Sequence, residues 1–322
     1  MESIINALRE YDRFLICTHT EPDGDALGSV LALTEGLSLM GKQVTPYLED
    51  RPTAQLRFLP GLEQISYHLN EITNYDVGII LDCGELERTG RNASRIGQIR
   101  LLINIDHHQP RAQTGHLRLI DPSSSCTGEI IYRLLARLNQ PITRNMALNL
   151  YTAIVTDTGS FTYSNTNQAT FDMAGDLVAR GVNPPEVSAH LYQSYPASRM
   201  KILSRALETI ELTGHGRVAF MIVTQDMVKE TGAGPNDTFG FIDFPRSISG
   251  VRLAVLFREV DPGIYNVSLR SKGQLNVAAL AGRHGGGGHT NAAGLLFKGS
   301  AADFKQEALE YVAAASWDRD GG

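Results

Sequence analysis

The sequence predicts an α/β protein with two domains. Its 322 residues exceed the usual size of one hydrophobic core, so each half is long enough to bury a core of its own. In the first half, short apolar runs at residues 13–17, 77–81 and 101–105 each end in acids or histidines, which is typical of buried parallel strands. A helical pattern lies between the first two runs, and this alternation favours a parallel sheet with crossover connections.

The predicted helices of the first half follow from spacing and stop signals. Residues 25–40 carry apolar side chains at helical intervals and are followed by Gly41, which favours the end of a helix. From residue 127 to residue 181 the strand patterns fade, and helices are predicted around residues 130–138, 147–155 and 171–179. Pro184 and Pro185 then interrupt the pattern.

The second half predicts a smaller α/β domain that follows a helical connector near residues 198–212. Apolar stretches at residues 218–223, 251–257 and 265–269 indicate strands, and residues 302–315 indicate a closing helix. We expect a first domain over residues 1–190, a linker over 191–212 and a second domain over 213–322.

Composition and net charge limit the kinds of partner that the protein is expected to bind. Hydrophobic residues make up 42% and charged residues 20%, as in folded globular proteins. A net charge of −6 argues against a broad basic face for long nucleic acids. No apolar run has the length of a membrane span and the start lacks a signal-peptide pattern, so we expect a cytoplasmic protein without a membrane partner. The three cysteines have no CxxC spacing and are expected to be reduced packing residues.

Ligand-type side chains follow each of the three strands predicted in the first half. They are His19, Asp23 and Asp25 after the first strand, Asp82 after the second, and Asp106, His107 and His108 after the third. An isolated Asp23 or Asp25 would be interpreted as a helix cap. Because the carboxyl ends of parallel strands share one edge of a sheet, the convergence of three such segments favours a site instead.

Asp157 is a further acid of this kind, between an apolar helical run and Thr158-Gly159. Alone it would be a cap or turn residue. A set of His and Asp without Cys suits manganese or magnesium better than structural zinc. So many acids favour a dinuclear centre.

In order and spacing, these four segments resemble the motifs of the DHH phosphoesterases, a family that includes RecJ-like nucleases, short-RNA ribonucleases and family II inorganic pyrophosphatases. The resemblance covers the first domain, to about Gly181. It implies a catalytic domain with two divalent ions, Mn²⁺ first and Mg²⁺ or Co²⁺ as alternatives. The implied ligands are His19 and Asp23 on one ion, Asp25, His107 and Asp157 on the other, and Asp82 bridging both.

The same resemblance implies catalytic roles for Asp106 and His108 beside the metals. Asp106 would orient a ligand and His108 would lie near substrate. A histidine that only hydrogen-bonds a carboxylate would leave the same pattern in the sequence. Relatives commonly read Ser-Ser-Thr where this chain has Ser125-Cys126-Thr127, so a capping hydroxyl is lost and the start of the helix containing Glu129 is left open.

A run of four glycines, residues 285–288, lies in the second half. Backbone without side chains can present N–H groups to a phosphate, whereas a flexible linker is the alternative reading. The flanking Arg283, His284 and His289 argue against a linker. The run resembles the glycine loop of the DHH-associated substrate-binding domain, and an exposed strand-end arginine is the alternative for Arg270. The implied substrate contacts are Arg270, Ser271, His284, Gly286, Gly287, Gly288 and His289.

The whole-chain resemblance is to bacterial oligoribonucleases that degrade RNA dinucleotides and slightly longer pieces to mononucleotides, with substrate held between the two domains. Many relatives also dephosphorylate 3'-phosphoadenosine 5'-phosphate. A cyclic or linear di-AMP phosphodiesterase would carry the same catalytic residues, and a non-catalytic nucleotide-binding protein is the alternative from another class. The intact ligand set argues against the latter, and the glycine run argues against a pyrophosphatase. Polarity of degradation and oligomeric state, a homodimer included, stay open.

Overall fold

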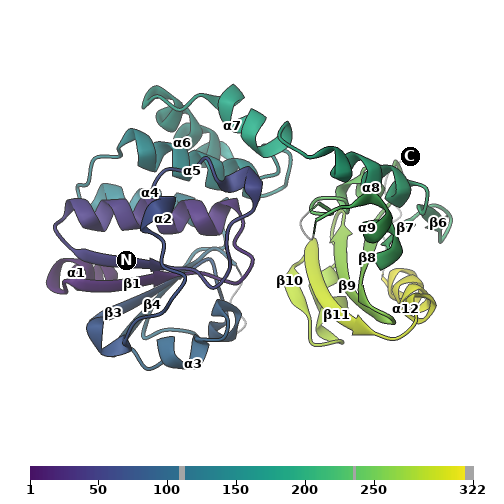
Figure 1. The fold of residues 1–322 in the computed structure, drawn as a ribbon, viewed down its shortest axis with the longest axis horizontal. Coiled ribbons are helices and arrows are strands. Elements are labelled where there is room, and N and C mark those ends of the chain that lie inside the picture. The colour runs from purple at the N-terminus through teal and green to yellow at the C-terminus, as the bar shows by residue number, and fades with distance from the viewer. Residues whose placement is uncertain (109–112, 235–236, 316–322) are drawn as a thin grey trace. The chain divides into compact units, whose positions relative to one another are not determined.

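The chain forms two compact units, Met1–Ser194 and Tyr195–Gly322 (Figure 1). The structure is a computed structural model that describes residues 1–108, 113–234 and 237–315. A five-stranded sheet organises the first unit and a six-stranded sheet the second, which confirms the expected α/β class. The division falls inside the segment expected as a linker, and the helix that follows it, α8 (Ala197–Leu207), packs on the second unit's sheet.

The first sheet has the strand order β2-β1-β3-β4-β5, and all its pairs are parallel. Its strands are β1 (Arg13–Cys17), β2 (Gln43–Tyr47), β3 (Val77–Leu81), β4 (Leu101–Asp106) and β5 (Leu117–Ile120). The three central strands lie where the apolar runs predicted them. The two edge strands were not predicted, because they are only partly buried and β2 contains Pro46, which an edge tolerates.

Seven α-helices accompany this sheet among the described residues. They are α1 (Glu2–Glu10), α2 (Gly24–Leu39), α3 (Ala93–Ile96), α4 (Thr127–Arg137), α5 (Arg144–Asp157), α6 (Gln168–Ala179) and α7 (Pro184–Tyr192), with short 3₁₀ turns at Ala54–Leu56, Leu62–Gln64, Ile72–Asn74 and Leu86–Thr89. The expected helices in α2 and α4 to α6 are confirmed. Pro184 and Pro185 begin a helix rather than interrupt one, since the first helical turn needs no N–H donor there.

Close packing of α2 on α5 positions the site. The two helices lie together with α4 on one face of the sheet (Figure 1). A Cβ on Gly28 would stand 2.3 Å from the Asn149 carbonyl oxygen, so only glycine permits this approach. As a result, the start of α2 and the end of α5, which carry Asp25 and Asp157, are held at one rigid junction.

The second sheet has the order β10-β11-β9-β8-β7-β6, antiparallel except for the parallel pair β7 and β8. Its strands are β6 (Glu211–Thr213), β7 (Val218–Val223), β8 (Leu253–Asp261), β9 (Ile264–Ser271), β10 (Gly287–His289) and β11 (Ala292–Lys298). Its other helices are α9 (Gln225–Thr231), α10 (Asp243–Ser247), α11 (Val277–Gly282) and α12 (Ala301–Ala314). Separate apolar clusters, around Phe257 and around Phe241, form the core of this unit.

Two further expectations concern the whole chain. Cys17, Cys83 and Cys126 are buried free thiols, as packing residues would be. Within the described ranges, no helix is both long enough and apolar enough to cross a membrane.

Candidate metal centre

Six ligand-type side chains gather where strands β1, β3 and β4 and helix α5 end. His19, Asp23 and Asp82 form a first trio, and Asp25, His107 and Asp157 form a second trio. In each trio the ligand atoms lie within 4.8 Å of one another. The structure therefore brings together all six residues that the resemblance implied. A third group with the same spacing, Asp82, His107 and His108, connects the two trios.

The first trio is held mainly by its own neighbours along the chain. Asp23 is the N-cap of α2, and its Oδ1 accepts a hydrogen bond from the Ala26 N–H at 3.0 Å. The Nδ1 of His19 lies 2.7 Å from the Thr20 carbonyl oxygen, which turns Nε2 toward Asp82, 3.5 Å away. Asp23 thus caps α2 and also lies among the ligand-type residues, two roles that the sequence presented as alternatives.

The second trio is held from a distance in sequence. Both carboxylate oxygens of Asp25 accept backbone N–H groups from the start of α4, Thr127 at 2.7 Å and Gly128 at 2.8 Å. Cys126, the N-cap residue of α4, makes no side-chain cap. Asp25 therefore replaces the missing capping hydroxyl, and α4 begins at Thr127 because a residue of another helix caps it.

His107 is the point of convergence. Its Nε2 lies 3.5 Å from Asp157, 3.7 Å from Asp82 and 3.9 Å from Asp25, while Nδ1 is 3.3 Å from the Ser124 carbonyl. These Nε2 separations are longer than hydrogen bonds. An imidazole nitrogen that faces three buried or half-buried carboxylates fits a site built around cations, with the other ring nitrogen held by the backbone.

The charge balance supports the same fit. Burial, and then the charges of Asp82 and Asp157, raise the pKa of Asp25 well above its usual range. Burial also raises the pKa of Asp157 to about 7, against the opposing effect of His107. Carboxylates held this close repel each other unless a cation lies among them, so the cluster suits divalent ions that prefer oxygen ligands.

Asp82 lies between the trios. One carboxylate oxygen faces His19, and the other accepts the Thr127 hydroxyl at 3.0 Å and faces His107. Burial alone would raise the pKa of Asp82, but hydrogen bonds from His108 and His19 hold it well below its usual range. Its backbone has a left-handed φ of 52°, a conformation that costs roughly 1–3 kcal/mol in a residue with a side chain. Strain of this kind is common at functional sites.

Asp106 fixes the orientation of His108. The Asp106 Oδ1 accepts the His108 backbone N–H at 2.9 Å and lies 2.7 Å from its Nδ1. Burial lowers the pKa of His108, but the hydrogen bonds to Asp106 and Asp82 raise it well above its usual value. Both side chains also line a cavity of about 130 Å³, which places a shaped space beside the trios.

In the second unit, Arg270 and His289 lie at the same level of the sheet, on the two strands that flank β11. Arg270 of β9 and His289 of β10 both pair with Ala292 of β11, so the two predicted substrate residues lie on either side of one central residue. Nη1 of Arg270 donates to the Leu269 carbonyl at 3.0 Å. The side chain of His289 lies outside the described part of the chain.

The glycine run forms backbone packing inside this unit. A Cβ on Gly288 would lie 2.2 Å from the Ala292 carbonyl oxygen, and one on Gly286 would lie 2.4 Å from the Gly294 oxygen. Gly287 pairs with Gly294, and the Gly286 N–H donates to the Ala281 carbonyl at 2.9 Å. The bare backbone therefore fits against β11, and this packing by itself requires glycines.

Two other predicted substrate residues also have partners inside the unit. His284 Nε2 lies 2.7 Å from Glu307, and its ring stands edge-on to Phe297. The hydroxyl of the buried Ser271 donates to the Leu275 carbonyl at 2.6 Å and accepts from Asn291 at 2.9 Å. These contacts account for both side chains without a ligand.

Three residues near the trios were missed from the sequence. Ser29 donates to Asp25, the Thr127 hydroxyl donates to Asp82, and Asn165 donates to Asp157. Ser29 lies one helical turn after Asp25, so helical spacing in the sequence could have predicted this contact. The contact between Thr127 and Asp82, which are 45 residues apart, could be found only from the folded structure.

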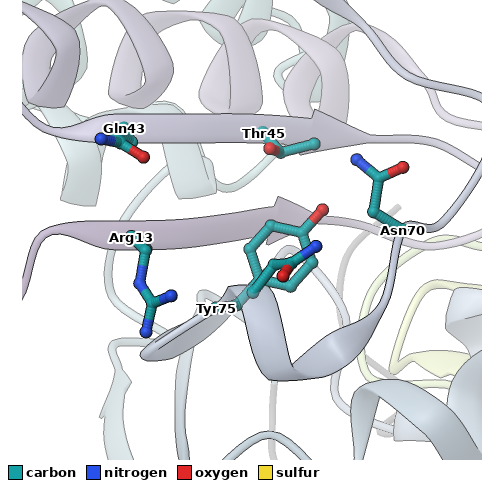
Figure 2. A pocket seen from close by; sticks show the side chains of 6 residues that line it. Arg13, Gln43, Thr45, Asn70 and Tyr75 are labelled. Carbon is teal, nitrogen blue, oxygen red and sulfur yellow. The ribbon is translucent and has the colours of Figure 1, made fainter.

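A larger cavity, about 340 Å³, lies at the other end of the first sheet (Figure 2). Arg13 and Gln43, the first residues of β1 and β2, line it, whereas the trios follow the ends of strands. The Arg13 guanidinium is paired with Asp76 at 2.6 Å. Neither the six ligand-type residues nor Asp106 and His108 line this larger cavity, whereas Asp106 and His108 do line the smaller one.

Comparison with known proteins identifies the family. Residues 13–154 match the DHH family N-terminal domain, and residues 215–316 match the DHHA1 domain. A "Bifunctional oligoribonuclease and PAP phosphatase NrnA" of Thermus thermophilus is 33% identical over 284 residues, 88% of this chain and 84% of the relative. A Bacillus subtilis protein of the same name is 28% identical over 296 residues, 90% of this chain and 91% of the relative.

A solved structure shows the same fold. The crystal structure of an exopolyphosphatase-related protein from Bacteroides fragilis superposes with a TM-score of 0.88 at 27% identity and covers 96% of each chain. Both domain models thus match in order along the chain, and a relative that is 33% identical over the aligned residues is matched along 84% of its length. The chain belongs to the DHH family, with a DHH N-terminal domain followed by a DHHA1 domain.

Proposed function

We propose that the protein is a metal-dependent phosphodiesterase that degrades very short RNA oligonucleotides to mononucleotides and also removes phosphate from 3'-phosphoadenosine 5'-phosphate. The observation that carries the proposal is the pair of trios joined at Asp82. The names of the Thermus and Bacillus relatives supply the substrate class. The net charge of −6 agrees with small substrates rather than long nucleic acids.

The six residues of the trios would hold two divalent cations, and we propose Mn²⁺ as the ion. When bound, such a pair lowers the pKa of a water and neutralises charge on a phosphate. Asp82 would contact both ions, because its two oxygens face the two trios. His108, oriented by Asp106, would face substrate from the neighbouring cavity.

We assign catalysis to the first unit and substrate recognition to the second. Arg270 and His289, both paired with Ala292, are the residues that we propose contact substrate phosphate, with Gly287 and Gly288 beside them in β10. Ser271, His284 and Gly286 would support that surface through their internal contacts. Buried free thiols agree with a cytoplasmic protein.

A substrate panel tests the proposal. Purified protein with Mn²⁺ is incubated with RNAs of increasing length from dinucleotides, phosphoadenosine phosphate, linear and cyclic di-AMP, and pyrophosphate. We expect the shortest RNAs to be cleaved fastest, chelator to abolish turnover, and Ca²⁺ to restore it less well than Mn²⁺. An Asp82→Ala preparation controls for contaminating nucleases.

Each alternative has its own result in this panel. Cyclic di-AMP as the preferred substrate would assign a dinucleotide phosphodiesterase. Binding of nucleotides without turnover would assign a non-catalytic protein and overturn the proposal.

A further inference from the structure

Asn165 makes an unusual set of contacts in the loop between α5 and α6. Its Nδ2 lies 2.8 Å from the Ser125 carbonyl oxygen, 3.1 Å from the Asp157 carbonyl oxygen and 3.1 Å from Asp157 Oδ2. All three neighbours are acceptors. The amide must therefore present its NH₂ group to them, which fixes its orientation.

These contacts reach the ligating atom itself. The Oδ2 of Asp157 that accepts from Asn165 is also the oxygen that faces His107 Nε2, 3.5 Å away. Among the residues that the structure describes, Asn165 is the side chain that hydrogen-bonds this carboxylate. Its contact to Ser125 also ties Asp157 to the segment just before α4, the helix that Asp25 caps.

The donor half of Asn165 makes all of these contacts. Its Oδ1 is buried and accepts no hydrogen bond from the described part of the chain. A leucine at this position would keep nearly the same branched shape, lose the donor and add no charge beside Asp157. Donor chemistry and packing can therefore be separated by one substitution.

We infer that Asn165 is a positioning residue that holds Asp157 Oδ2 toward the cation of the second trio, an inference that rests on the metal centre of the proposed function. Residues that hydrogen-bond a metal ligand fix its direction, and losing one typically weakens metal affinity or activity about 10- to 100-fold. Asn165 fits this role because it contacts the ligating oxygen and the backbone of the same residue.

Asn167 provides a matched control two residues away. Its Oδ1 accepts the Thr170 N–H at 3.1 Å as the N-cap of α6, and its Nδ2 lies 3.4 Å from the Ser123 carbonyl. It contributes hydrogen bonds to the same loop but contacts no member of either trio in the described contacts. A purely structural loop residue should behave as Asn167 does.

The experiment is calorimetric titration of metal-free protein with Mn²⁺, together with thermal unfolding of the same samples. We expect Asn165→Ala and Asn165→Leu each to weaken one of two Mn²⁺ sites about 10- to 100-fold and to spare the other. Asn167→Ala should lower the midpoint of unfolding and leave both affinities at wild-type values. Asp157→Ala identifies which site belongs to the second trio.

Wild-type affinity at both sites in Asn165→Leu would overturn the inference, because a side chain of similar volume without the donor would then be sufficient. The leucine variant also decides the matter if Asn165→Ala does not fold. Wild-type protein that binds no Mn²⁺ would instead overturn the proposed function, so the two failures have different readouts.

Discussion

The two trios differ in what holds them. His19 and Asp23 are fixed by Thr20 and Ala26, their neighbours along the chain. Asp25 is fixed by Gly128, 103 positions away, and Asp157 by Asn165 in the next loop. Two residues of the first trio lie in one loop, and Asp82 joins them from the end of β3. The second trio needs α2, β4 and α5 to be packed together, with Asp25 also anchored on α4. Metal binding and folding should therefore be more tightly coupled in the second trio.

The largest effect should come from the residue that the trios share. Asp82→Ala removes the carboxylate between them, so we expect loss of both Mn²⁺ sites and a fall in activity beyond the roughly 100-fold seen when a supporting residue is lost. The fold should persist, as circular dichroism would report. Appreciable turnover with Mn²⁺ would contradict the bridging position.

Replacing a local ligand should have a smaller and recoverable effect. His19→Ala removes one ligand of the first trio and touches no helix contact, so we expect weaker binding at one site and partial recovery of the rate at high Mn²⁺. Asp25→Ala also uncaps α4, which costs about 0.5–2 kcal/mol of stability. Equal unfolding midpoints for the two variants would contradict the claim that Asp25, unlike His19, is coupled to helix capping.

A change outside both trios should spare the metals. We expect Arg270→Ala to slow hydrolysis of short nucleotides about ten- to a hundredfold, the effect of losing a hydrogen bond worth about 1.5–3 kcal/mol to a charged group. His289→Ala should behave in the same way. Mn²⁺ affinity and hydrolysis of bis-p-nitrophenyl phosphate should stay near wild type in both. An equal loss on both substrates would remove Arg270 and His289 from substrate recognition.

The smallest effect concerns the metal-free protein. Because the folded-state pKa of Asp157 is raised to about 7, its charge destabilises the fold above that pH, and stability should rise as pH falls from 8 toward 5. Asp157→Asn should raise the unfolding midpoint at pH 8 by a few degrees and flatten this dependence. Saturating Mn²⁺ should make the wild type more stable than the variant. A midpoint that falls on acidification over this range would contradict the assignment.

The same contrast explains what the sequence could predict. The central strands and the clustering of the six ligand-type residues were predictable because apolar runs and the acids that follow them are local patterns, as at Leu81 and Asp82. Strands β10 and β11 were not predicted, because a run of glycines is typical of a loop. Its pairing with β11 becomes visible only in the folded structure. The start of α4 was left open for the same kind of reason, since its cap comes from Asp25 and no local residue announces it.

The cap on α4 also affects what a sequence comparison can reveal about activity. A descendant that no longer hydrolysed anything would still need an acceptor at position 25 to begin that helix, so selection for folding alone would retain Asp25. The described contacts of His19 are with the Thr20 carbonyl and with Asp82, and neither of them caps a helix. Among related chains, loss of His19 should therefore be an earlier sign of lost hydrolysis than loss of Asp25, and an intact acid at position 25 is weak evidence that the chemistry survives.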